Sequence, residues 1–195
     1  MSSIAANLHV DQVYSAMWAL SECLTIPSAQ ATLINQAFNQ WRLVSATDNQ
    51  NTQELMGEDG TLVAPENGLY SIYLQTLLQS QSDQDFPGGG DVEHWCVVSH
   101  KSDISPRLGL QMGGRCTTLS NSGQQQFFLP ALSTSLTLSL FKDSTISLFA
   151  YQKTGKTLSI FGEPDTYDGT VSTMGLPKVG TILGFHLINR HSSPP

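Results

Sequence analysis

The histidines are the first residues to examine for chemistry, because histidine is the commonest general base and a frequent metal ligand. His94, His100 and His186 lie in segments that alternate like β-strands. His94 and His100 are six residues apart, so they face the same side of one strand at a separation of about 20 Å. That separation is too long for a shared metal ion. We therefore expect each histidine to be satisfied within the fold or exposed, and not catalytic.

Two groups of carboxylates lie beside glycines in predicted loops, where they could hold a calcium ion. The groups are Asp83, Asp85 and Asp91, and Glu163, Asp165 and Asp168. Neither group has the spacing of a helix-loop-helix calcium loop. We expect solvated carboxylates in both loops, with no metal and no cofactor.

The motifs of common catalytic and phosphate sites are absent from the sequence. No Gly-x-Ser-x-Gly turn is present, and Glu93-His94 is not part of a His-Glu-x-x-His zinc motif. The glycine-rich loop at residues 86–90 lacks the Lys-Ser/Thr pair of a phosphate-binding loop. The sequence therefore predicts a protein that is not an enzyme.

The composition favours a single all-β domain. Only 13% of the 195 residues are charged, and Ser, Thr, Gln, Gly and Asn are abundant, which is typical of strands joined by many turns. The net charge is −7 and the basic residues are scattered, which argues against nucleic-acid or anionic-membrane partners. No run of 18 apolar residues could span a membrane, and we expect no signal peptide.

The longest candidate strand covers residues 68–78 and organises the rest of the chain. One face would carry Leu69, Ser71, Tyr73 and Gln75, and the other Tyr70, Ile72, Leu74 and Thr76. Both faces are largely apolar. Such a strand is expected inside a sandwich, or between a sandwich core and a partner chain.

Further alternating segments follow at turn-separated intervals. They cover residues 92–100, 108–112, 135–140, 145–151 and 179–188, with shorter strands expected near 53–56 and 61–64. Residues 79–91 and 154–177 are read as loops because of their glycines and prolines. A total of about nine strands favours a sandwich over a solenoid.

The N-terminal residues have a different pattern, with apolar side chains three and four positions apart. These are Val10, Val13, Met17, Leu20 and Leu24, with a second short set at Ala31, Ile34, Phe38 and Trp41. The spacing predicts a helix that Pro27 would end. Residues 1–38 would form either an amphipathic helical segment packed on the domain or a short trimeric coiled-coil stalk.

Residues 62–75, Leu-Val-Ala-Pro-Glu-Asn-Gly-Leu-Tyr-Ser-Ile-Tyr-Leu-Gln, resemble the central strand of the tumour necrosis factor (TNF) ligand superfamily. Gln40-Trp41 resembles the family's first strand, and Leu183-Gly184-Phe185-His186-Leu187-Ile188 is similar to its last. The resemblance covers residues 39–190 and leaves 191–195 as a flexible tail. It implies a TNF-like jelly-roll β-sandwich that assembles as a homotrimer.

The resemblance also implies roles for particular residues. Tyr73 and Ile182 match family positions at the three-fold axis of the trimer. The turn at Asp103, Ile104, Ser105 and Pro106 matches a loop that inserts an apolar residue into a receptor. Cys96 and Cys116 become a candidate disulfide, because the family often joins two loops near here. Cys23, on the predicted helix, is expected to be free and buried.

Two functions agree with these features. The first is a trimeric TNF-like cytokine at the cell surface or outside the cell, which clusters a cell-surface receptor in immune or cell-death signalling. The second is a trimeric attachment head, similar to a viral fibre knob or a complement-type globular head, which binds a host receptor or glycan. A membrane anchor encoded upstream of Met1 would favour the first function, and a fibrous repeat the second.

Overall fold

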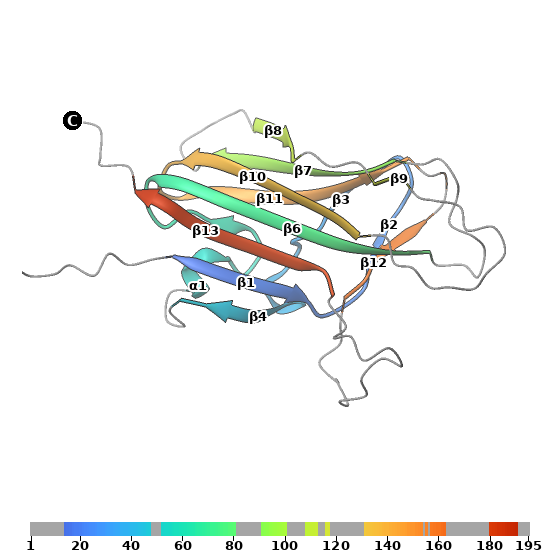
Figure 1. Ribbon diagram of the computed structural model, residues 1–195, viewed down its shortest axis with the longest axis horizontal. Coiled ribbons are helices and arrows are strands. Elements are labelled where there is room, and N and C mark those ends of the chain that lie inside the picture. Colours follow the sequence, from blue (N-terminus) through green and yellow to red (C-terminus); the bar gives the residue numbers. More distant parts are fainter. Residues whose placement is uncertain are drawn as a thin grey trace, which may run out of the picture.

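The computed structural model describes residues 14–47, 52–80, 91–100, 108–112, 116–117, 131–153, 155, 157–162 and 180–190. Within these ranges the chain forms two antiparallel sheets packed face to face, as expected for the β-sandwich predicted from the sequence (Figure 1). Two short helical segments accompany them, η1 (Phe38–Gln40) and α1 (Thr52–Leu55). None of the described helices is long or apolar enough to cross a membrane.

The first sheet has the order β2-β12-β6-β13-β1-β4, with β10 also paired to β6. Its strands are β1 (Ser15–Leu20), β2 (Leu24–Ile26), β4 (Trp41–Ala46), β6 (Gly68–Ser80), β10 (Ala131–Leu140), β12 (Leu158–Ile160) and β13 (Ile182–Arg190). In Figure 1 the strands β10, β6, β13, β1 and β4 form one layer.

The second sheet has the order β3-β11-β7-β8, with β5 paired to β11 and β9 paired to β7. Its strands are β3 (Ala31–Leu33), β5 (Leu62–Val63), β7 (Asp91–His100), β8 (Leu108–Gln111), β9 (Cys116–Thr117) and β11 (Ser144–Gln152). Burial along β11 alternates without exception, as expected for a strand with one face on the core.

Strand β6 is the centre of the first sheet. It pairs with β10 along one edge, and with β13 and then β12 along the other. The predicted alternation along β6 is confirmed, since Tyr70, Ile72 and Leu74 are buried while Leu69 and Tyr73 are only partly covered. Strand β6 therefore contributes both to the core and to an outward surface.

The core between the sheets is apolar and contains large side chains. Trp18, Tyr70 and Phe185 are at most 1% exposed, and burying each such side chain contributes about 1.5–3 kcal/mol. The rings of Tyr70 and Phe185 stack with centroids 4.9 Å apart. The last strand is thereby fixed against the central one, and this pairing positions the outward faces of both.

The helix predicted in the first 26 residues is wrong from Ser15 onward. Residues 15–20 and 24–26 are strands, and β1 pairs with both β13 and β4. The second predicted helical set instead spans β3, η1 and the start of β4. The described part of residues 1–38 is therefore built into the two sheets, while residues 1–13 lie outside the described chain.

Two smaller expectations were also wrong. The segment near residues 53–56 forms α1 followed by a single bridge between Met56 and Leu62, and not a strand. The loop-rich stretch at 154–177 contains a short strand, β12, which pairs with β2 and β6. Its three residues are too few for a periodic pattern to be visible in the sequence.

Candidate functional site

The outward surface of the first sheet is the best candidate for a functional surface. We define this outer face as the residues of β1, β6, β10 and β13 that point away from the core. Register assigns to it Ser15, Met17, Ala19, Leu69, Ser71, Tyr73, Gln75, Leu77, Ser133, Ser135, Thr137, Ser139, Ile182, Gly184, His186 and Asn189, and exposure adds Ile188, which has no partner in the register. No acidic residue, lysine or arginine is among them, although the chain has 25 such residues, 16 acidic plus 9 basic.

Tyr73 lies near the middle of the outer face. It pairs with Gly184 of β13 on one side and with Ser135 of β10 on the other. Both neighbours are small, and a Cβ added at Gly184 would lie 3.5 Å from the Tyr73 Cβ. Small residues therefore flank the Tyr73 side chain on both neighbouring strands, and the chain's own atoms cover it only in part.

A short polar network joins β6 to β10 beside Tyr73. The Tyr73 hydroxyl donates to Gln75 Oε1 at 2.9 Å. The Ser133 hydroxyl donates to the same oxygen at 3.3 Å. These bonds hold the tyrosine and glutamine side chains along the sheet, which reduces the conformational entropy that would be lost if another surface covered them.

His186 contacts β1 across the outer face. A hydrogen bond connects its Nδ1 atom with the Ser15 hydroxyl, and the two residues are direct cross-strand partners. Partial burial lowers the pKa of His186 below its ordinary value of 6.5. No charged group in the described chain contributes to this shift, so the serine–histidine pair lacks the carboxylate that would orient a catalytic base.

Ile182 and Ile188 occupy the two ends of β13 on this face. Ile182 is partly covered and pairs with Gln75. Ile188 is 56% exposed at an irregularity in the pairing with β6. The structure thus brings Tyr73 and Ile182, predicted from sequence as axis residues, onto one surface. Gly184, His186 and Ile188 lie on this surface as well. The sequence placed them on the last predicted strand but did not indicate that they belong to this surface.

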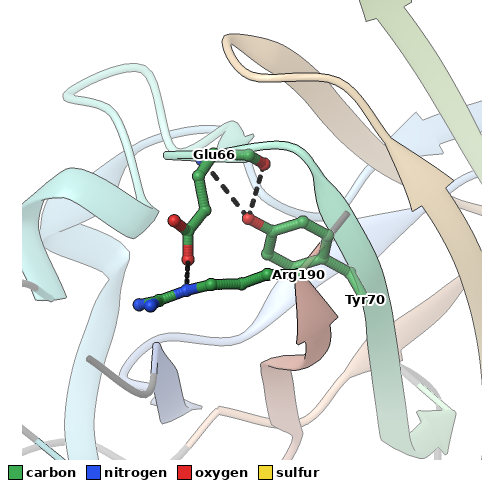
Figure 2. Close-up of polar contacts among 3 residues, drawn as sticks. All are labelled: Glu66, Tyr70 and Arg190. Atoms are coloured by element: carbon green, nitrogen blue, oxygen red, sulfur yellow. Dashed lines mark hydrogen bonds and ion pairs between the residues drawn. The ribbon is translucent and has the colours of Figure 1, made fainter. Parts of the chain in front are cut away.

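A polar cluster fixes the end of β13 to the turn before β6 (Figure 2). Arg190 Nε lies 2.6 Å from Glu66 Oε1, and the Tyr70 hydroxyl donates to the Glu66 carbonyl oxygen at 2.9 Å. Burial is the largest effect on the Tyr70 hydroxyl and raises its pKa to about 12. The cluster is structural, since Tyr70 is fully buried and each partner is engaged by another.

The predicted receptor turn, Asp103 to Pro106, lies outside the described residues. The described range before this turn ends at His100, the last residue of β7. The His100 ring contacts the ring of Phe141 edge-on, with the two ring centroids 6.0 Å apart. Phe141 is 66% exposed in the turn between β10 and β11. Asn67 Oδ1 accepts a hydrogen bond from the Lys142 amide at 2.7 Å and holds this turn in place.

The cysteine predictions need two corrections. Cys96 is a buried free thiol on β7, so the candidate bridge to Cys116 is absent. Cys116 pairs instead with Val92, four residues and about 13 Å along β7 from Cys96, which is beyond disulfide reach. Cys23 is free as predicted, but it is exposed rather than buried, because its segment is not a helix packed on the core.

The remaining sequence candidates do not form a chemical site in the described chain. No group of three or more metal-ligating side chains gathers there. His94 is fully buried and hydrogen-bonded to two threonines. Of the two acidic groups, only Asp91 is in a described range, as the first residue of β7.

Comparison with known proteins identifies the fold. No protein-family model and no curated protein sequence matches the chain. Among solved structures, Eiger TNF from S. frugiperda matches with a TM-score of 0.56 and 11% identity over 94% of this chain and 98% of that chain. Murine APRIL matches with a TM-score of 0.52 and 12% identity over 91% and 100%. The protein therefore has the TNF-like jelly-roll β-sandwich that the sequence predicted.

Proposed function

We propose that the protein is a homotrimeric, TNF-like ligand that binds and clusters a cell-surface receptor. The observation that carries this proposal is the uncharged outer face centred on Tyr73, in a sandwich with the fold of TNF ligands. Receptor clustering of this kind needs geometry and no catalysis.

The outer face has the composition expected of a protein interface. Interface centres are depleted in charged residues and enriched in aromatic residues, with polar groups that can be satisfied. Tyr73 supplies a partly covered aromatic ring, and Ile182 and Ile188 supply aliphatic area around it. A second copy is the occupant that we propose, since the same face on each copy would bring uncharged surfaces together around a three-fold axis.

The receptor would then contact the edges of the assembly, at loops of neighbouring subunits. The Asp103–Pro106 turn remains our proposed contact. The exposed Phe141 beside His100 supports this location, because it adds an apolar side chain next to the point where that loop leaves β7. Apolar anchors of this kind are frequent hot spots in interfaces.

Measurement of mass in solution tests the assembly. Light scattering coupled to size exclusion at micromolar concentration should give about 64 kDa, three times the 21.2 kDa of the chain. Tyr73→Ala should shift the mass toward the single chain, because truncating a buried aromatic costs about 3–5 kcal/mol at each site. Tyr151→Ala is the matched control, since Tyr151 faces outward from β11 in the other sheet.

A single species of one chain mass for the natural protein would contradict the proposal. So would a Tyr73→Ala variant that unfolds before it dissociates, because Tyr73 would then support the fold of one chain. Receptor binding is tested by measuring how the intact trimer binds to immobilised ectodomains of TNF-receptor-family proteins. A trimer that binds none of a complete set would leave an attachment head as the function.

A further inference from the structure

We infer that His186 makes the association of copies pH-dependent, so that the trimer forms at neutral pH and separates when this imidazole gains a proton. The inference rests on the proposed function, because it concerns the same outer face. The regulation of assembly by pH would follow from one side chain, His186, and its neighbours.

The position of His186 is set by contacts within one chain. Its Nδ1 atom is hydrogen-bonded to Ser15 of β1, and its ring leans over Gly184, where an added Cβ would lie 3.0 Å from His186 Nε2. The histidine is therefore held flat along β13, between its own chain and any surface that covers the outer face. Only the small Gly184 leaves room for this arrangement.

Among the residues that the structure describes, no group that faces His186 can neutralise a positive charge. From β1 it is faced by Ser15 and Met17, from β6 by Ser71 and Tyr73, from β10 beyond them by Thr137, and along β13 by Gly184 and Ile188. Of these, only the tyrosine has an ionisable side chain, and its hydroxyl donates a hydrogen bond to Gln75 Oε1. The next charged residue along β13, Arg190, is itself positive and forms an ion pair with Glu66.

The direction of the effect follows from burial. Partial desolvation already lowers the pKa of His186 below 6.5 in one chain. Covering the face with another copy removes more water from the ring, and two further copies place the same charge nearby, so assembly lowers this pKa again. Association is then fully present above the pKa of the separated chain, and it is lost as the pH falls through the window below 6.5.

The expected magnitude follows from linkage. Each trimer holds three His186 side chains, so dissociation takes up as many as three protons within the window between the two pKa values. The trimer association constant should then fall by up to about 1000-fold for each pH unit. At micromolar protein, one or two pH units would convert a stable trimer into separate chains.

The test is sedimentation velocity of the natural protein at pH 7.5, 6.5, 5.5 and 5.0, with circular dichroism at each pH to confirm that the sheets persist. We expect a trimer at pH 7.5 and smaller, folded species at the lowest values. His186→Gln, which keeps a polar group without a titrating proton, should remain a trimer throughout. His100→Gln is the matched control, since His100 ends β7 in the other sheet, and it should dissociate like the natural protein.

The outcomes separate this inference from the proposed function. A natural protein that is already a single chain at pH 7.5 overturns the trimer itself. A trimer that persists at pH 5.0 with native circular dichroism overturns only the role of His186, as does a His186→Gln variant with an unchanged pH response. Should His186→Gln fail to fold, His186→Lys provides a permanent charge, and a folded His186→Lys trimer at pH 7.5 would also overturn the inference.

Discussion

His94 Nε2 lies 2.9 Å from Thr76 Oγ1, and this contact joins the two sheets inside the core. On its other side, His94 Nδ1 lies 2.8 Å from Thr134 Oγ1. Thr134 donates its own hydroxyl proton to the Leu74 carbonyl oxygen at 3.3 Å. It must therefore accept from Nδ1–H, and Nε2 is left to accept from Thr76. The network is complete only with a neutral imidazole.

The first prediction is that His94 makes the fold sensitive to acid. Burial lowers its pKa from 6.5 to about 3, so the unfolded chain binds a proton that the folded chain does not. Stability is intact above pH 6.5 and should fall by up to about 1.4 kcal/mol per pH unit as the pH drops toward 3. Urea denaturation at several pH values measures this slope.

The controls for His94 use the His186→Gln background, in which the proposed assembly no longer titrates. Replacing His94 by Gln there should lower stability at pH 7 and flatten the dependence below pH 6.5. An equal slope with and without His94 would show that the acid response comes from other groups.

The second prediction compares two contacts in the cluster of Figure 2. Tyr70→Phe removes the hydroxyl that donates to the Glu66 carbonyl and should cost about 1–2 kcal/mol, because the site is buried. Glu66→Gln removes the charge from an ion pair whose side chains are 30% and 35% exposed and should cost less than about 1 kcal/mol. Chemical denaturation of both variants gives the order, and the reverse order would contradict it.

The third prediction explains the glycine of the Gly68-Leu69-Tyr70 motif. A Cβ at Gly68 would lie 2.7 Å from the Asn189 carbonyl oxygen and 2.5 Å from Leu187 Cδ1, at the irregular pairing of β6 and β13. Gly68→Ala should therefore destabilise the fold by about 1–3 kcal/mol. Gly109→Ala is the control, because no atom lies within 4 Å of its added Cβ, and a similar loss there would refute the explanation.

The strands with strict alternation could be predicted from sequence. In these strands the polarity of each side chain alone shows whether it faces the core or the outside. Leu136 and Leu138 of β10 alternate with Ser135 and Thr137, and the structure places the leucines inward. Met17 and Leu20 were assigned to a helix instead, because their three-residue spacing fits the period of a helix. Pairing of β1 with β13 and β4 decides the outcome there, and such long-range pairing leaves no local signal.

The candidate site was predictable only in part for the same reason. Tyr73 could be named because its motif is local to one strand. The Ser15–His186 contact joins residues 171 positions apart, so no local pattern could reveal it. It also depends on β1 being a strand, and the helix prediction removed Ser15 from consideration. Likewise, Phe141 became a candidate only when the turn that exposes it was seen beside the end of β7.

The last prediction concerns the receptor surface. Asn67 and Ala64 hold the turn at 141–143 through the Lys142 and Asp143 amides, so Phe141 projects from a fixed backbone and a substitution there should not disturb the fold. Phe141→Ser and Ile104→Asp should each leave the trimer intact and weaken binding to a receptor ectodomain at least about 30-fold, as expected for a hot spot worth about 2 kcal/mol. Val44→Ser, at a 53% exposed position on the edge strand β4, is the matched control and should bind normally. If both variants kept full affinity as intact trimers, the receptor contact would have to lie away from this end of the sandwich.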